Sequence, residues 1–265
     1  MERTLVLGIL NVTPDSFADG GKFLDSTDAI NQGRRLIAEG ADIIDVGGES
    51  TRPGAERVSQ DEEIKRVIPV ITELVKDGAV ISVDTTRAEV ARQAIAAGAT
   101  YVNDVSGGLA DEKMAQLIAA NPKVQYIVMH WRGESKDMQS KAIYKDVVKE
   151  VKDELDDRVS QLIKAGVQTE QIILDPGIGF AKEPDHNWAI LQNIERFQLL
   201  GYPILIGASR KRFLGELVNA KDTADRESAS IALTAELARL NIWGVRTHSV
   251  KPHRDAIAVI DRLRK

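Results

Sequence analysis

Carboxylate, amide and basic side chains stand at the ends of short apolar runs along the whole sequence. Runs of branched apolar residues bounded by polar residues are typical of β-strands, so these side chains would mark strand ends. Carboxylates and amides suit a ring that displays adjacent N–H donors and acceptors, and clustered Arg and Lys suit a small anion. We therefore expect one pocket that binds a heterocycle beside an anion. Its candidates are Asn11, Arg52, Asp84, Asn103, His130, Asp175, Gly207, Lys211, Arg246 and His248.

Each of these residues also has a plainer interpretation. Asp84 comes shortly before Arg87-Ala88-Glu89, so it could cap a helix, because Asp is a preferred N-cap residue. Asp175, within Leu-Asp-Pro-Gly, is harder to explain by capping alone. The basic residues could be ordinary surface residues, as most Arg and Lys side chains are. One such residue carries little information, whereas a polar group after every apolar run favours a shared site.

The apolar runs alternate with longer segments that carry apolar residues at helical spacing, which predicts a parallel sheet with helices between its strands. We predict eight strands, near residues 4–9, 43–46, 80–83, 101–103, 125–129, 171–174, 203–206 and 245–246. We predict helices over residues 29–37, 63–75, 90–95, 147–163, 188–194, 228–240 and 256–263. An open doubly wound sheet also fits this pattern, but eight similar units favour a single α/β domain, a (β/α)8 or TIM barrel over residues 1–265. In such barrels the active site lies at the C-terminal ends of the strands, where the polar residues would meet.

The charge balance and the residue types argue against several kinds of partner. Forty acidic and 35 basic residues give a formal net charge of -5, so we expect neither nucleic acid nor membrane as a partner. The sequence has no cysteine and no apolar run near the roughly 20 residues of a membrane span, so a cytoplasmic location is the default expectation. The four histidines lack the spacing of a zinc helix, and we place His186 and His253 at the surface or at helix termini. Mg²⁺ that bridges a diphosphate needs only one or two protein ligands, and Asn11 is the candidate.

Several motifs together resemble the signatures of the dihydropteroate synthase family. The first is Gly8–Phe17 followed by Asp19-Gly20-Gly21, and the second is Asp45–Ala55. The motifs that follow in the same order are Ser82–Thr85, Val102–Gly108, Leu174–Lys182, Ser209–Lys211 and Arg246–His248. Some of these motifs would be weak alone, but together they span nearly the whole chain and are specific. Met129–Arg132 resembles actinobacterial members, and Ala18 stands where many members have serine.

This resemblance implies a role for each matching residue. The pterin ring would lie against Asp84, Asn103, Met129, Asp175, Gly207 and Lys211. The diphosphate would bind Asn11, Arg52, Arg246 and His248, and Asn11 would also touch the Mg²⁺ cofactor. The p-aminobenzoate site would consist of Phe17, Thr51, Pro53, Phe180 and Ser209. The catalytic residues would be Asp84, Asp175, Lys211, Arg246 and His248.

The activity that the resemblance implies joins p-aminobenzoate to 6-hydroxymethyl-7,8-dihydropterin diphosphate, and yields 7,8-dihydropteroate and pyrophosphate in folate biosynthesis. Pyrophosphate would depart before the amine attacks, and the protein would be a homodimer. The loops over residues 13–22 and 50–58 are rich in Gly, Pro and polar residues and should be mobile without ligand. Two alternatives are a methyltetrahydrofolate-binding methyltransferase module and a non-catalytic pterin-binding paralogue. The first would not need Lys211, Arg246 and His248, and the second should have lost members of the anion or aminobenzoate clusters.

Overall fold

The computed structural model describes residues 3–13, 26–49, 57–134 and 136–264. Phe17, Thr51, Arg52 and Pro53 therefore lie outside the described residues, as do most residues of the two loops that we expect to be mobile. Within the described part of the chain, no helix is both long and apolar enough to cross a membrane.

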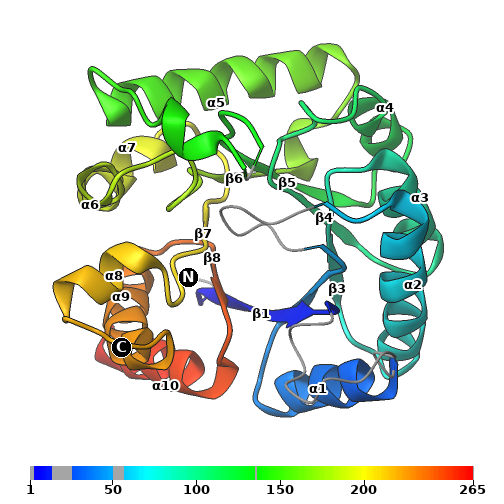
Figure 1. Cartoon of the computed structure of the whole chain (residues 1–265), viewed down its shortest axis with the longest axis horizontal. Coiled ribbons are helices and arrows are strands. Elements are labelled where there is room, and N and C mark those ends of the chain that lie inside the picture. Colours follow the sequence, from blue (N-terminus) through cyan, green and yellow to red (C-terminus); the bar gives the residue numbers. More distant parts are fainter. Residues whose placement is uncertain (1–2, 14–25, 50–56, 135, 265) are drawn as a thin grey trace.

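In the described residues, eight parallel strands form one sheet at the centre of the molecule (Figure 1). They are β1 (Leu5–Asn11), β2 (Ile43–Gly47), β3 (Ile81–Asp84), β4 (Tyr101–Asp104), β5 (Gln125–Met129), β6 (Ile172–Asp175), β7 (Leu205–Ile206) and β8 (Gly244–Thr247). The strands pair in the order β6-β5-β4-β3-β2-β1-β8-β7, and a bridge between Leu174 and Ile204 joins the two ends of the sheet. The sheet thus closes into a barrel. All the predicted strands are confirmed, and the open doubly wound alternative is excluded.

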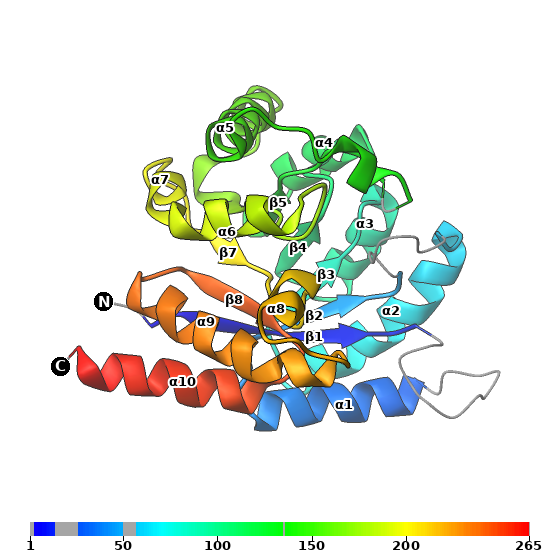
Figure 2. The same cartoon turned by 60° about the vertical axis from the view of Figure 1, so that its left-hand side comes forward.

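Helices surround the strands as an outer ring (Figures 1 and 2). They are α1 (Ser26–Ala38), α2 (Gln60–Lys76), α3 (Ala88–Ala96), α4 (Lys113–Ala119), α5 (Val147–Lys164), α6 (Pro184–Gln192), α7 (Ile194–Gln198), α8 (Arg212–Leu217), α9 (Glu227–Arg239) and α10 (Val250–Leu263). The apolar periodicity missed α4 and α8, which are too short to show a clear repeat. The helix predicted over residues 188–194 corresponds to α6, but α6 begins earlier, at Pro184, and ends at Gln192, because Asn193, with φ −119° and ψ 24°, separates it from α7.

Local sequence signals start and stop the helices so that each strand can follow. Ser59 caps α2, since its side chain accepts a hydrogen bond from the backbone N–H of Glu62 at 3.2 Å. After α3, Gly98 has φ +107°, which glycine adopts without the strain that a side chain brings. A Cβ at Gly98 would also come within 2.7 Å of the Val75 side chain. Glycine is therefore required at this turn both by the backbone and by the packing.

Side chains of the strands alternate between the two faces of the barrel wall. Outward residues such as Val46 and Val83 pack against the helices in the main apolar core. A second apolar cluster, within the barrel, consists of Leu7, Ile43, Ile127, Ile173 and Leu205. Two residues further along β2 and β6, the same inward face carries Asp45 and Asp175. The barrel is therefore filled by apolar side chains, and a layer of polar residues lies above them at the C-terminal end.

Candidate active site

Arg246 connects three strands at the C-terminal end of the barrel. Its Nε donates to Oδ2 of Asp45 at 2.5 Å, and its Nη2 donates to Oδ2 of Asp84 at 2.8 Å. The side-chain amide of Asn103 donates to the same Asp45 oxygen at 3.0 Å. Asp45, Asp84 and Asn103 are buried and come from the neighbouring strands β2, β3 and β4. One guanidinium thus binds two carboxylates and, through Asp45, fixes an amide on the same wall of the barrel.

The carboxyl groups of Asp84 and Asp175 are easier to protonate than ordinary ones, because their pKa values are raised. Burial raises the pKa of Asp84 to about 7; the charge of Arg246 opposes this rise, and that of Asp45 adds to it. Burial also raises the pKa of Asp175, against the opposing charge of Lys211. Perturbed pKa values of buried acids are characteristic of functional sites. When Asp45 and Asp84 are both ionised, the single charge of Arg246 leaves this wall with a net negative charge, which suits a ligand edge that carries N–H donors.

Lys211 reaches the site from the loop that follows β7. Its Nζ donates to the backbone carbonyl of Ile178 and lies 4.5 Å from the centre of the Phe180 ring. Oδ1 of Asp175 accepts a hydrogen bond from the N–H of Gly177 at 2.7 Å, which fixes the start of the loop that carries Ile178 and Phe180. Burial lowers the pKa of Lys211 to about 8, and the charge of Asp175 opposes this shift. The ammonium therefore contacts an aromatic face and lies within electrostatic reach of a buried acid.

Residues without long polar side chains lie between these charged groups. A Cβ at Gly207 would stand 3.8 Å from Oδ2 of Asp175 and 3.8 Å from Cβ of Arg246, so the glycine leaves that space open. Met129 is buried and pairs with Asp175 across β5 and β6. The structure thus brings to one end of the barrel the residues expected to hold a pterin ring: Asp84, Asn103, Met129, Asp175, Gly207 and Lys211.

Ser209 and His248 link the loops that follow β7 and β8. Oγ of Ser209 lies 3.1 Å from Nδ1 of His248 and accepts a hydrogen bond from the His248 N–H at 3.3 Å. The next residue, Arg210, has φ +57°, and its Nε donates to Glu227 of α9 at 2.5 Å. Glu227 thereby holds the left-handed turn between Ser209 and Lys211. Helix α9 thus fixes the turn that carries two residues of the predicted site, Ser209 and Lys211.

Asn11 is the last residue of β1 and pairs with Gly47 of β2 at the barrel mouth. Its side chain is partly exposed and offers one amide oxygen. Among the residues that the structure describes, no group of three acidic, His or Cys side chains could hold a metal ion by itself. Mg²⁺ prefers six oxygen ligands and retains several waters. Among the described residues, Asn11 fits Mg²⁺ as one ligand beside the oxygens of a bound diphosphate and water.

The alternative that Asp84 caps a helix is wrong. Its carboxylate accepts a hydrogen bond from Arg246, whereas the first N–H of α3, at Ala88, donates to Asp111 at 2.8 Å. The two remaining histidines, His186 and His253, both lie in the first turn of a helix, as expected. His253 is nevertheless buried, and its Nδ1 lies 2.7 Å from Oγ1 of Thr234.

Asp45 is a site residue that the sequence prediction omitted, because it lies within an apolar run and not at its end. The alternation of side chains along β2 could have identified it. Asp45 is two residues after Ile43, so both side chains face the interior of the barrel. Oδ2 of Asp45 has two hydrogen-bond donors, but its Oδ1 is buried and has no partner among the described residues. The buried Oγ of Ser82, on the adjacent strand, also lacks a partner in that part of the chain.

The fold and this arrangement of charges define a barrel enzyme with places for a hydrogen-bonding ring and an anion. The model of the family described as pterin binding enzyme matches residues 7–248 of the chain. The dihydropteroate synthase of Mycobacterium leprae is 48% identical over 261 residues, which are 96% of this chain and 92% of that relative.

Solved structures agree with this relationship. The dihydropteroate synthase of Xanthomonas albilineans with 4-aminobenzoic acid matches with a TM-score of 0.93 and 40% identity, over 99% of this chain and 94% of that one. The enzyme of the same bacterium in complex with 7,8-dihydropteroate matches with a TM-score of 0.90 and 37% identity, over the same shares of both chains. The chain belongs to the dihydropteroate synthase family of pterin-binding enzymes.

Proposed function

We propose that the protein joins p-aminobenzoate to 6-hydroxymethyl-7,8-dihydropterin diphosphate and releases 7,8-dihydropteroate and pyrophosphate. It would then be a transferase of an alkyl group other than methyl. The observation that carries this proposal is the contact of Arg246 with both Asp45 and Asp84. It places acceptors for the N–H groups of a pterin next to a cation that can attract the diphosphate of the same substrate.

The proposed substitution is dissociative. The bond between the exocyclic methylene carbon and the diphosphate oxygen breaks first, and its electron pair leaves with pyrophosphate. The positive charge that remains spreads into the pterin ring, where the carboxylates of Asp84 and Asp175 stabilise it because both are buried. The amine nitrogen of p-aminobenzoate then bonds to the methylene carbon and releases one proton. No covalent bond to the protein forms.

The diphosphate would lie against Arg246 and His248. It would also bind Arg52, which lies outside the described residues. Asn11 would donate its amide oxygen to Mg²⁺. Bound there, the metal ion would neutralise charge on the departing pyrophosphate. Arg246 is suited to this role because its guanidinium stays charged while Asp45 and Asp84 hold it in a fixed orientation. Arg246 would therefore stabilise the negative charge that develops on the diphosphate in the transition state with little reorganisation of its side chain.

The p-aminobenzoate would enter beside Phe180 and Ser209, together with Phe17, Thr51 and Pro53, which lie outside the described residues. Lys211 contacts the Phe180 ring and is within electrostatic reach of Asp175, which supports a position between this subsite and the carboxylate of Asp175. Its position allows one ammonium to bind the pterin and to border the aminobenzoate. The aniline nitrogen is a modest nucleophile, and the subsite would contribute mainly positioning and the exclusion of water.

A substitution of Lys211 tests this assignment. Lys211→Ala should raise the KM for the pterin diphosphate and lower kcat, because one side chain serves both subsites; Lys221→Ala, at an exposed lysine, is the matched control. Near-normal kinetics of Lys211→Ala would remove the assignment. Methyltetrahydrofolate serves as a competing ligand in the same experiment. Binding of it in preference to the pterin diphosphate would favour the methyltransferase module.

We also propose that the protein is a homodimer formed through α10. Val259 and Leu263 are four residues apart on this helix, and their side chains are 58% and 77% exposed. Two large apolar side chains on one helical face are a suitable centre for an interface between two copies. Sedimentation velocity should give a dimer for the native chain and a monomer for Leu263→Glu. A native monomer would contradict the proposal.

A further inference from the structure

Lys182 is a buried lysine whose ammonium contacts no carboxylate among the described residues. Its side chain lies just after the loop that follows β6 and is 3% exposed. Nζ donates to the backbone carbonyl of Phe180 at 3.1 Å and contacts Nδ1 of His130 at 3.0 Å. Burying an amine in this way is costly, and a packed apolar side chain would fill the space with less penalty. We therefore expect the contacts of Lys182 to have a role in the candidate active site.

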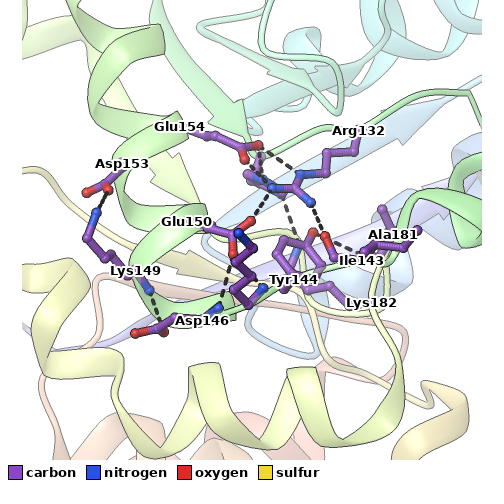
Figure 3. Close-up of polar contacts among 12 residues, drawn as sticks. Arg132, Ile143, Tyr144, Asp146, Lys149, Glu150, Asp153, Glu154, Ala181 and Lys182 are labelled. Carbon is purple, nitrogen blue, oxygen red and sulfur yellow. Dashed lines mark hydrogen bonds and ion pairs between the residues drawn. The ribbon is translucent and has the colours of Figure 1, made fainter.

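The hydrogen bonds around His130 fix its tautomer. The pKa of Glu154 is lowered to about 2, so its ionised carboxylate can only accept, and the imidazole proton must be on Nε2; Nδ1 of the neutral His130 then accepts from Lys182. Nε2 lies 2.9 Å from Oε2 of Glu154, which accepts this proton. Glu154 belongs to α5, and Arg132 also donates to it (Figure 3). A carboxylate on an outer helix thus orients the imidazole that holds Lys182.

A second contact holds the next carbonyl of the same loop. The hydroxyl of Tyr144 donates to the carbonyl of Ala181 at 3.0 Å, and the guanidinium of Arg132 lies over the Tyr144 ring, 4.0 Å from its centre (Figure 3). Ala181 has φ +47°, a left-handed conformation that is strained for any residue with a side chain. Lys182 and Tyr144 therefore hold the two carbonyls on either side of a strained backbone position.

This backbone position determines where two predicted site residues meet. Phe180 directly precedes Ala181, and its ring lies against Lys211. The carbonyl of Ile178 in the same loop accepts a hydrogen bond from Lys211. A relaxed Ala181 would turn Phe180 and displace both contacts of the Lys211 ammonium.

We propose that Lys182 is a positioning residue for the p-aminobenzoate subsite: with His130 and Tyr144 it clamps the strained turn at Ala181, so that Phe180 and Lys211 are held against each other. This inference rests on the proposed function. It assigns the Glu154, His130 and Lys182 chain to the specificity of the reaction, although none of these side chains touches the reacting atoms.

The test compares Lys182→Met, which keeps the length of the side chain and removes its donors, with the native chain. The KM for p-aminobenzoate should rise about tenfold, and more than the KM for the pterin diphosphate, because Asp84 and Asn103 are untouched. Lys149→Met is the control, since Lys149 is an exposed lysine of α5 that pairs with Asp153. It should leave both constants unchanged.

A rescue distinguishes positioning from general stability. Adding Ala181→Gly to Lys182→Met changes the strain at the turn but restores no hydrogen bond. The double variant should recover part of the KM for p-aminobenzoate, because glycine adopts the left-handed conformation without strain and the turn then depends less on the clamp. Lys182→Arg should also recover part of this KM through its retained donors. If Lys182→Met changes the Tm but neither KM, the inference is overturned.

Tyr144→Phe keeps the inference testable if Lys182→Met does not fold. Loss of this hydroxyl releases only the Ala181 carbonyl, so the KM for p-aminobenzoate should rise about threefold. An unchanged KM for p-aminobenzoate in folded Tyr144→Phe would overturn the inference that the turn at Ala181 is clamped. The native chain is assayed in parallel: if it shows no turnover, the proposed function fails, whereas turnover with unaffected variants removes only the clamp.

Discussion

Arg246 on β8 donates a 2.8 Å hydrogen bond to Asp84 on β3, 162 residues earlier in the chain. The contact crosses the mouth of the barrel, and Asp45 accepts from the same guanidinium. Arg246 therefore belongs to the wall that would bind the pterin as well as to the group that would bind the diphosphate. In the proposed function, binding of the two halves of one substrate would be coupled through this side chain.

Arg246→Lys should lower kcat/KM for the pterin diphosphate about a hundredfold. A lysine keeps the charge, but a single ammonium cannot bind both carboxylates in the fixed geometry of a guanidinium. Steady-state kinetics measures the loss, and Arg239→Lys, at an exposed pair with Glu236, is the control. Equal kcat/KM values for both variants would show that Arg246 contributes only charge.

The activity of the native chain should fall in acid with an inflection near the pKa of Asp84. That pKa is raised to about 7, so Asp84 loses its negative charge as the pH falls through neutrality. A protonated Asp84 can no longer stabilise positive charge on the pterin. The plot of kcat/KM against pH, which reports groups of the free enzyme, should therefore decline below about 7. A flat profile from pH 8 to 5 contradicts this role.

Asp45→Asn should move this inflection to lower pH. The negative charge of Asp45 helps to raise the pKa of Asp84, and its loss leaves Arg246 to pair with Asp84 alone. We expect the acid limb of kcat/KM to shift while its plateau falls about tenfold, since Asn103 and Arg246 lose a charged partner. The same variant with an unshifted inflection would indicate that another group titrates.

His130 should make the protein less stable in mild acid. Burial lowers its pKa from 6.5 to about 4, with the charge of Lys182 adding to the shift. The unfolded chain therefore binds the proton first, so the stability from neutral His130 is complete above pH 6.5 and is lost as the pH falls toward 4.

The measurement for His130 is Tm against pH for the native chain and for His130→Gln. The native chain should lose more Tm between pH 6.5 and 4 than the variant, which has no group to titrate at this position. Taking the difference between the two chains removes the contributions of other groups. Parallel curves would mean that His130 is not held neutral by the fold.

The strands and their polar ends were predictable from the sequence because each depends on a local pattern. Val80 to Val83 shows the apolar run of a buried strand, and Asp84 directly follows it. The same logic located Asp175 and Arg246. The contacts among these polar residues depend on the order of the strands in the barrel, which the sequence does not show. The closure between β6 and β7 rests on a single bridge, which no local pattern indicates.

Other parts of the site escaped prediction for equally physical reasons. Asp45 lies inside an apolar run, where its role depends on the direction of its side chain. Glu154 lies on α5 among Glu150, Asp153, Asp156 and Asp157, so in the sequence it resembles one residue of a solvated helical face. Its partner His130 is 24 residues away, and only the packing of α5 against the barrel brings them together.

The proposed reaction is tested by measuring pyrophosphate release by the purified protein given dihydropterin diphosphate, Mg²⁺ and p-aminobenzoate, with each component omitted in turn. Release of pyrophosphate should require all three components, with 7,8-dihydropteroate formed in equal amount. Binding of the pterin diphosphate without release of pyrophosphate would contradict the proposed reaction, and would identify the protein as a non-catalytic pterin-binding paralogue.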